Sequence, residues 1–486
     1  MHPFDPYHLF EKALQQWPAR PALRIGTEDR TYGELHDRAC AYASWIEREQ
    51  VGAKRIAVFA RKTFNAYAAI LGILRSGRSY VPIHPDHPIE RCAAMLRAAG
   101  VTAGICEEVD RSRLGPIDGV RWCSDPGSYH SSTVIPSGGE AYVMFTSGST
   151  GGPKGVPVGR EQVAAYLQHQ LGTHRFTPDD RFTQFFALTF DLSVHDLFIC
   201  WASGGILCVA DEAGALRSAG FAREEKITVW FSVPSQVELL RRVRALKADS
   251  LPDLRLAFFC GEALSPGTAA AFRIAAPDAK IFNLYGPTET TIAVTAQEVE
   301  LDHLQRARIP IGRIFPDHVA YVDHDGSIRS QGEGELLIGG PQVNGGYLND
   351  PVATAKAFIE YNGVQLYRSG DLVNIDPGGT IDLIGRKDDQ VKVMGHRIEP
   401  AEVDHVLGPA IAPARSITLA AEINGSRRLV TFIDHDMDPA QLFDLLRARL
   451  PHYMVPERIV PVAGFTYSTS GKLDRRALLE RLGRTE

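Results

Sequence analysis

The chain has 486 residues, of which 44% are hydrophobic and 23% are charged, a balance that excludes a disordered, collagen-like or coiled-coil protein. Lysine and arginine total 52 against 58 aspartate and glutamate, a net charge of −6 at pH 7, so we expect no nucleic acid partner. The sequence has no apolar stretch of about 18 residues and no signal-peptide pattern at its start, so we expect a cytoplasmic protein that does not enter a membrane.

The first 120 residues alternate between helical and strand-like patterns. Apolar residues recur at helical spacing in 34–49 and 66–77, and 55–60 is a short β-rich run. Alternation of this kind predicts an α/β fold with parallel strands and crossover helices.

The same alternation returns further along the chain. A strand is expected in 226–234, a helix in 236–246 and a buried strand in 254–261. From about residue 308 short strands separated by glycine turns follow instead, which predicts a smaller β-rich subdomain.

The last part of the chain reads as a compact α+β unit of about 100 residues. Its helices and strands are expected at 399–407, 416–423, 428–435 and 439–450. We place the boundary near Asp388, which gives a large domain of residues 1–387 and a small domain of residues 388–486.

Seven cysteines are spread along the sequence, and none forms a CxxC pair that would indicate zinc or a redox dithiol. We therefore expect reduced thiols, most of them buried. They are Cys40, Cys92, Cys106, Cys123, Cys200, Cys208 and Cys260.

The segment YVMFTSGSTGGPKGV, residues 142–156, runs from a β-rich stretch into a loop dense in hydroxyl groups and glycines. Backbone N–H groups, hydroxyls and an ammonium group in such a loop suit the binding of phosphate. It is not a Walker A loop, because Pro153 stands where that motif needs glycine. The loop residues that we expect to contact phosphate are Thr146, Ser147, Gly148, Ser149, Thr150 and Lys154.

Further short motifs follow this loop: FDLSVHDLF, NLYGPTETT, GELLIGGPQVNGGYLNDP, YRSGDLV, GRKDDQVKVMGHRIEPAEVD and SGKLDRRAL. In this order they resemble the adenylate-forming superfamily, and specifically the adenylation domains of nonribosomal peptide synthetases. The resemblance covers nearly the whole chain. It implies a large N-terminal domain, made of two α/β subdomains and a β-rich subdomain, followed by a small mobile α+β domain.

The resemblance also implies a two-step reaction that uses ATP and Mg²⁺. A carboxylate attacks the α-phosphorus of ATP to give an acyl adenylate and pyrophosphate, and a thiol then captures the acyl group. Thr146, Ser147 and Lys154 would hold the β and γ phosphates and neutralise the leaving pyrophosphate.

In NLYGPTE, the resemblance assigns Tyr285 to adenine packing and Gly286 to the same nucleotide site. Thr288 would contact the α-phosphate during catalysis. Glu289 would be the Mg²⁺ ligand, since Mg²⁺ takes one or two protein carboxylates alongside phosphate oxygens.

Asp371 in YRSGDLV matches the carboxylate that receives both ribose hydroxyls. Arg386, the arginine of the GRxD motif, is assigned to the same nucleotide site. The family often has an aromatic residue three positions before this arginine, and here that residue is Leu383. Adenosine packing would therefore depend more on Tyr285.

Lys472 in SGKLDR matches the catalytic lysine that bridges the substrate carboxylate and the nucleotide. Asp388 aligns with the hinge about which the small domain turns. Gly395 matches the face on which the thioester forms, where a missing side chain leaves room for a pantetheine arm, and Lys392 is assigned to catalysis there.

The first aspartate of FDLSVHDLF, Asp191, matches the residue that pairs with the α-ammonium of an amino acid substrate. The alternative is that Asp191 caps a helix. The side-chain pocket would be lined by Leu192, His195, Phe231, Phe258, Cys260, Leu284, Ile292 and Ala293. This mostly apolar wall predicts a small or medium, largely apolar amino acid such as proline, alanine or serine. His195 either hydrogen-bonds a polar substrate side chain or is a satisfied core histidine.

Only RALLERLGRTE follows the last lysine motif, so we expect a free-standing ligase that loads the phosphopantetheine of a separate carrier protein. An acyl-CoA synthetase is the alternative enzyme, against which Asp191 argues. A non-catalytic interaction protein is the alternative from another class, although all the expected catalytic groups are present.

Overall fold

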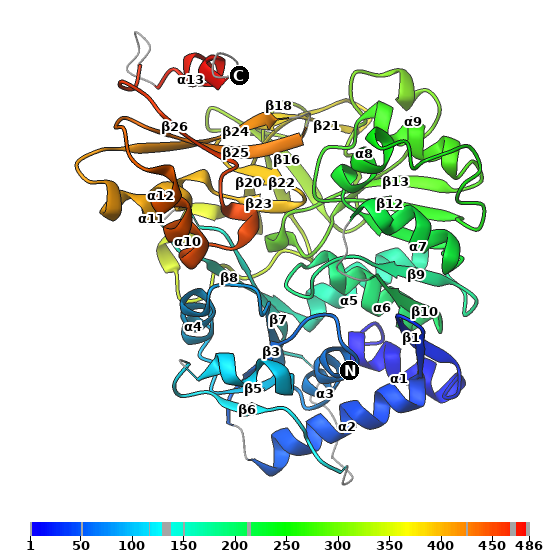
Figure 1. Ribbon diagram of the computed structural model, residues 1–486. Coiled ribbons are helices and arrows are strands. Elements are labelled where there is room, and N and C mark those ends of the chain that lie inside the picture. Colours follow the sequence, from blue (N-terminus) through cyan, green and yellow to red (C-terminus); the bar gives the residue numbers. More distant parts are fainter. Residues whose placement is uncertain are drawn as a thin grey trace. The chain divides into compact units, whose positions relative to one another are not determined.

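The computed structural model in Figure 1 describes residues 2–49, 52–115, 117–128, 138–148, 151–210, 215–423, 426–466 and 473–482. The chain forms two compact units. The first consists of Met1–Pro85, Leu96–Met144 and Gly155–Lys387, and the second of Asp86–Met95, Phe145–Lys154 and Asp388–Glu486. Helices and sheets are mixed throughout, which confirms the predicted α/β class.

The largest sheet of the first unit has nine strands, of which the six central ones are parallel. Antiparallel strands complete both edges. In spatial order the strands are β15 (Arg313–Ile314), β14 (Thr295–Glu298), β13 (Lys280–Tyr285), β12 (Leu256–Phe259), β11 (Val229–Ser232), β9 (Arg181–Gln184), β10 (Ile206–Val209), β1 (Pro21–Ile25) and β2 (Glu28–Thr31).

A second sheet of this α/β part has six strands, with parallel pairing along most of its width. In spatial order they are β6 (Arg121–Cys123), β5 (Ala103–Cys106), β3 (Arg55–Phe59), β4 (Ser79–Ile83), β7 (Glu140–Thr146) and β8 (Lys154–Gly159).

Ten α-helices accompany these strands in the described residues before 360. They are α1 (Pro6–Gln16), α2 (Tyr32–Arg48), α3 (Phe64–Arg75), α4 (Ile89–Ala98), α5 (Arg160–Thr173), α6 (Leu192–Ser203), α7 (Ser218–Glu224), α8 (Pro234–Arg242), α9 (Pro266–Ala275) and α10 (Pro351–Ala357). The short 3-10 helices are η1 (Glu108–Leu114), η2 (Ala215–Arg217), η3 (Thr288–Thr290) and η4 (His303–Gln305).

Local sequence explains where several helices begin and end. Thr31 and Glu34 form a capping box at the start of α2, and Gly204 ends α6 in the left-handed conformation. Helix α8 is shorter than the predicted 236–246, because Arg244 adopts a positive φ of 56°.

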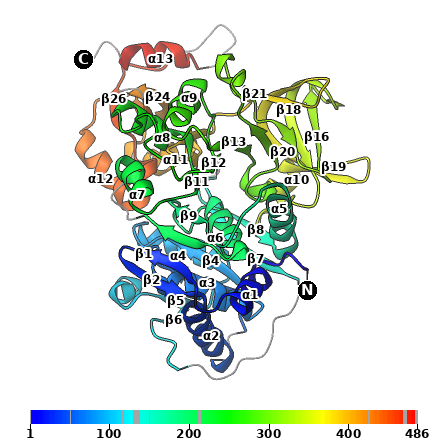
Figure 2. The same cartoon turned by 90° about the vertical axis from the view of Figure 1, so that its right-hand side faces the viewer.

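The predicted β-rich subdomain is present as an antiparallel sheet, which Figure 2 shows as one body with α10 beside it. Its strands are β17 (Ser327–Arg329), β16 (Val319–His324), β18 (Gly332–Gly339), β20 (Val364–Ile375) and β19 (Phe358–Tyr361), with β21 (Ile381–Arg386) paired to β20.

The second unit contains the two helices and the two long strands that the sequence predicts between residues 399 and 450. A hairpin pairs β22 (Val391–Val393) with β23 (His396–Ile398), and a three-stranded sheet joins β24 (Ser416–Ile423), β25 (Ser426–Ile433) and β26 (Arg458–Pro461). The helices are α11 (Pro400–Ile411), α12 (Pro439–Arg449), α13 (Arg475–Leu482) and the 3-10 turn η5 (His452–Met454).

The parallel strands β11 and β12 are buried on both faces. Val229 and Phe231 belong to the core shared with α5 and α6, whereas Trp230 between them belongs to the core shared with α7, α8 and α9. In β12, Phe258 and Phe259 divide in the same way. Alternation along a strand therefore directs one phenylalanine of each strand toward the α5–α6 face.

All seven cysteines are buried and none is bridged, as the sequence predicts. Among the described residues, no helix is both long enough and apolar enough to cross a membrane.

A buried ion pair fixes the amino-terminal helix to the rest of the first unit. Arg160 Nη1 lies 3.0 Å from Asp5 Oδ2, and both side chains are almost completely buried. Asp5 also caps α1, because its Oδ1 accepts from Tyr7 N at 3.0 Å and His8 N at 3.2 Å.

The substitution Asp5→Asn keeps the cap acceptor but leaves the Arg160 charge without its buried counterion. We expect the free energy of unfolding to fall by about 3 kcal/mol, since breaking one side of a buried pair is strongly destabilising. Urea unfolding followed by circular dichroism measures this loss. Asp37→Asn, on an exposed position of α2, is the control, and equal midpoints for the two variants would contradict the expectation.

Candidate active site

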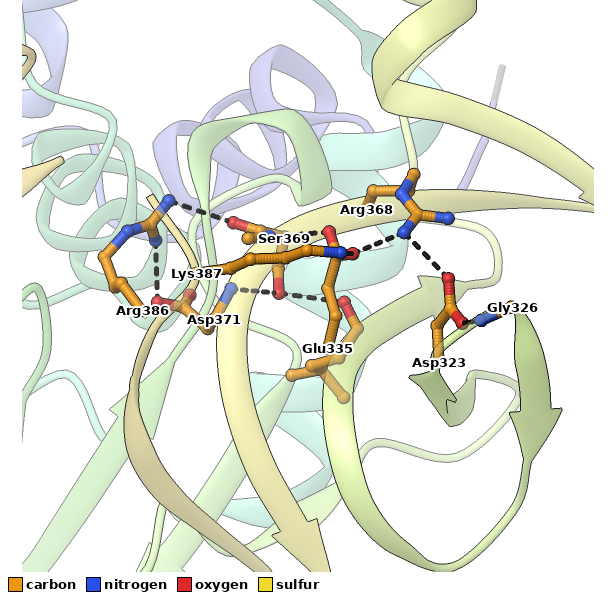
Figure 3. Close-up of polar contacts among 10 residues, drawn as sticks. Asp323, Gly326, Glu335, Arg368, Ser369, Asp371, Arg386 and Lys387 are labelled. Carbon is orange, nitrogen blue, oxygen red and sulfur yellow. Dashed lines mark hydrogen bonds and ion pairs between the residues drawn. The ribbon is translucent and has the colours of Figure 1, made fainter. Parts of the chain in front are cut away.

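The predicted nucleotide residues Tyr285, Asp371 and Arg386 lie together in the first unit. Tyr285 Oη donates to Asp371 Oδ2 at 2.6 Å. Arg386 Nη1 donates to Asp371 Oδ1 at 2.6 Å (Figure 3). They come from β13, β20 and β21 respectively. Both carboxylate oxygens are thus oriented, and each keeps lone-pair capacity for a ribose hydroxyl.

A charged network surrounds the strand that carries Asp371 (Figure 3). Arg368 bonds both Asp323, at 2.8 Å, and Glu335. Glu335 also pairs with Lys387 at 3.3 Å. The Ser369 hydroxyl donates to Leu336 O at 2.8 Å and accepts from the Asp371 N–H at 3.0 Å. These contacts hold β18 and β20 in register beneath Asp371.

The YGPTE turn begins where β13 ends. A Cβ added to Gly286 would lie 2.5 Å from Ala293 Cα, so only glycine allows this close backbone approach. Thr288 and Glu289 follow in the 3-10 helix η3.

The Glu289 carboxylate is buried, and its Oε1 accepts from Tyr347 Oη at 2.7 Å. Its backbone oxygen accepts from Asn344 N at 3.0 Å. No cluster of three or more His, Cys, Asp or Glu residues that would hold a metal by themselves occurs in the described part of the chain. A buried carboxylate oxygen held by a neutral donor fits a hard cation that takes its other ligands from phosphate.

The backbone after this turn is strained. Thr291 and Ile292 have φ values of 59° and 71°, a region that β-branched residues rarely occupy. Gln342 holds the strained segment, because its Nε2 donates to Thr291 O at 2.9 Å and Ala293 O at 2.8 Å. The Thr291 hydroxyl donates back to Gln342 O at 2.8 Å.

The residues predicted to line the side-chain pocket are all buried. His195 packs its ring on Phe231, with centroids 4.5 Å apart, and on Phe258 at 5.3 Å. Cys260 Sγ lies 4.0 Å from Ile292 O. The apolar members belong to one core: Leu192, Phe231, Phe258, Cys260, Leu284, Ile292 and Ala293. The structure thus brings His195 together with Phe231 and Phe258. The role of all these residues in substrate binding stays a prediction.

Asp191 stands at the N-cap position of α6 but makes no side-chain cap hydrogen bond, so the alternative of a capping aspartate is wrong. It is a buried carboxylate. Burial, and next the nearby Asp191 charge, raise the pKa values of Tyr80 and Tyr142. A carboxylate in this setting is matched to a cationic group.

The predicted phosphate loop falls in the second unit. Ser147 Oγ donates to Arg397 O at 2.8 Å and accepts from Glu399 N at 3.0 Å. A Cβ on Gly148 would lie 2.2 Å from Gly152 O. The backbone passes so close at this point that only glycine fits. Ser147 must give up its bond to Arg397 before it can donate to a phosphate oxygen.

Thr146 ends strand β7 and Lys154 begins strand β8, so they flank this loop. Asp388 Oδ1 accepts from Gln390 N at 3.2 Å. Lys392 lies opposite Arg397 in the antiparallel register of β22 and β23. Gly395 lies in the turn of this hairpin and has a φ of 81°. The predicted site residues Ser149, Thr150 and Lys472 lie outside the described residues.

Sequence reasoning did not assign roles to Gln342, Asn344 and Tyr347. All three stand in GPQVNGGY, which is part of the motif GELLIGGPQVNGGYLNDP. The signal in the sequence was a pair of amide residues between glycines. Side chains of this kind need hydrogen-bond partners if they are buried.

A family model described as AMP-binding enzyme matches residues 10–348. The chain belongs to this family. It is 34% identical to the D-alanine–D-alanyl carrier protein ligase of Lactiplantibacillus plantarum, over 93% of this chain and 94% of that protein. The resemblance to adenylation domains is thereby confirmed.

Two further relatives support this assignment. The chain is 32% identical to tyrocidine synthase 3 of Brevibacillus parabrevis over 98% of its own length, although it spans only 8% of that synthase. The solved adenylation domain AlmE of Vibrio cholerae, in complex with glycyl-adenosine-5'-phosphate, superposes with a TM-score of 0.88 at 29% identity and covers 99% of this chain and 98% of that one.

The substitution Gln342→Met removes the amide that holds the strained turn while keeping side-chain volume. We expect the free energy of unfolding to fall by about 3 kcal/mol, because buried carbonyl oxygens lose their donor. Urea unfolding tests this. Gln305→Met, at an exposed position of η4, is the matched control and should change the midpoint little. A similarly small change for Gln342→Met would show that the turn does not depend on the Gln342 amide.

Proposed function

We propose that this enzyme activates an amino acid with ATP and transfers the aminoacyl group to the phosphopantetheine thiol of a separate carrier protein. The observation that carries the proposal is the buried Asp191 carboxylate, in the same unit as the Tyr285–Asp371–Arg386 contact. The first would select the α-ammonium, and the second would hold the ribose. The similarity to a D-alanyl carrier protein ligase supports both steps.

In the first step, an oxygen of the substrate carboxylate forms a bond to the α-phosphorus. The bond between that phosphorus and the bridging oxygen breaks, and pyrophosphate leaves. Lys472 would lie between the two anions and offset their repulsion, while Thr288 would donate to the α-phosphate. The hydroxyls of Thr146 and Ser147, the flanking Ser149 and Thr150, and the Lys154 ammonium would hold the leaving pyrophosphate.

Glu289 is the residue that we assign to Mg²⁺. The ion, when bound, would neutralise phosphate oxygens as charge moves onto the leaving group. Tyr347 would keep the carboxylate in place through its 2.7 Å hydrogen bond to Oε1.

In the second step, the carrier's thiol sulfur attacks the carbonyl carbon, and AMP leaves with the electrons of the carbon–oxygen bond. Gly395 and Lys392 lie on one short hairpin, which we assign to this step. A glycine at the turn leaves room for a pantetheine arm. Asp388, next to the junction of the two units, is the proposed hinge.

The decisive experiment is amino-acid-dependent exchange of labelled pyrophosphate into ATP, across the proteinogenic amino acids, D-alanine, and several aryl and fatty acids. We expect exchange with an α-amino acid and none with acids that lack the amine. Lys472→Ala should lower exchange at least about 100-fold, since it removes charge stabilisation at the reacting groups.

Lys247→Ala, at an exposed position, is the control and should retain exchange. Exchange driven only by aryl or fatty acids would establish an acyl-CoA synthetase instead. Silence with every acid would overturn the proposed activity.

The substitution Asp191→Asn keeps the size of the side chain and removes its charge. We expect KM for the amino acid to rise about 100-fold while KM for ATP changes little, because a buried charge pair is lost on one side only. Asp179→Asn, a largely exposed aspartate, is the control. An unchanged KM for the amino acid would remove Asp191 from the ammonium site.

A further inference from the structure

Three residues follow one another along one face of helix α5, each four positions from the next. Tyr166 and Gln170 lie one turn apart in the helix, and His174 is its C-cap residue. Tyr166 Oη lies 2.7 Å from His195 Nδ1 on the neighbouring helix α6 (Figure 1). The His174 ring packs on Phe258 with centroids 4.9 Å apart.

Both ends of this face therefore contact the same group of side chains. Phe258 packs on His195, and both residues are predicted to line the side-chain pocket. Gln170 stands between the two contacts on the same face of α5, and its side chain is fully buried.

The polar atoms of this wall lack partners. His195 Nε2, Gln170 Oε1 and Gln170 Nε2 are buried and have no hydrogen-bond partner among the described residues, and both side chains are 0% exposed. Buried polar atoms in folded proteins are nearly always paired. Three such atoms beside one group of side chains indicate a hydrogen-bonding occupant.

The protonation of this wall follows from its contacts. Burial raises the pKa of Tyr166 well above its usual value, so its hydroxyl stays protonated and shares a hydrogen bond with His195 Nδ1 in which either atom can be the donor. Burial lowers the pKa of His195 to about 3, so the ring is neutral. A neutral ring carries one proton, so Nε2 is a donor when Tyr166 donates to Nδ1 and an acceptor when Nδ1 donates to Tyr166.

We propose that the amino acid substrate carries an uncharged side chain with a hydrogen-bonding group, a hydroxyl or a carboxamide, held by His195 Nε2 and the Gln170 amide. This inference rests on the proposed function and narrows its substrate class. The expectation of a largely apolar substrate, drawn from the wall residues alone, overlooked Gln170.

Apart from Asp191, which we assign to the α-ammonium, the described residues of this wall offer no full charge to balance a charged substrate side chain. Phe231 and Phe258 are apolar, His195 is neutral, and burial lowers the pKa of His174 to about 4. A carboxylate or ammonium there would lose its hydration without a counterion. A hydroxyl or carboxamide can both donate and accept, so it pairs with His195 Nε2 in either tautomer and with either end of the Gln170 amide.

The test compares polar amino acids with apolar ones of similar shape in the pyrophosphate exchange assay, using the unmodified enzyme and both enantiomers. The pairs are serine with alanine, threonine with valine, asparagine with leucine, and glutamine with methionine. For the preferred pair we expect the polar member to exceed its apolar counterpart at least about 30-fold in kcat/KM, because the apolar analogue leaves buried groups unpaired.

Variants then assign the discrimination to these atoms. Gln170→Leu and His195→Phe should lower the ratio of polar to apolar kcat/KM at least about tenfold while KM for ATP is unchanged. Gln168→Leu, on the exposed side of the same helix, should preserve the ratio. The wild-type comparison does not depend on how well the variants fold.

The outcomes separate this inference from the function on which it rests. Exchange that prefers an apolar or a charged amino acid overturns the inference and leaves the ligase function standing. An unchanged ratio in folded Gln170→Leu and His195→Phe enzymes also overturns it. Silence with every amino acid overturns both.

Discussion

The central constraint on this structure is that the parallel strands β11 and β12 are covered by helices on both faces. Every side chain on these strands must then be placed in one core or the other. Phe231 and Phe258 fall on the face of α5 and α6, and Trp230 and Phe259 fall on the opposite face. A shift of register by one residue would exchange the two sets and destroy the wall that contains His195.

Buried carboxylates form the second constraint. Asp371 and Glu289 each accept from a tyrosine hydroxyl, and Asp371 is also paired with Arg386. Orienting these groups before a ligand arrives removes the reorganisation that water would otherwise require. The strained backbone at Thr291 and Ile292 persists because neighbouring amide contacts hold it.

Much of this fold and site was readable from the sequence, because the motifs are local strings and the helices and strands have clear periodicity. The positions of Tyr285, Asp371 and Asp191 follow from such strings. The role of Gln342 does not follow from a local string, because its amide donates hydrogen bonds to carbonyl oxygens about fifty residues away in the sequence. Gln170 looks like an ordinary polar residue of a helix, and only its burial without partners distinguishes it.

The burial of all seven thiols has a consequence for an enzyme that handles activated acyl groups. Thiolates, rather than thiols, attack such groups, and burial raises the pKa of Cys106 to about 11 and that of Cys123 to about 12. The Cys106 and Cys123 thiols are therefore both buried and protonated at neutral pH. An acyl adenylate made by this enzyme would therefore not acylate these two thiols.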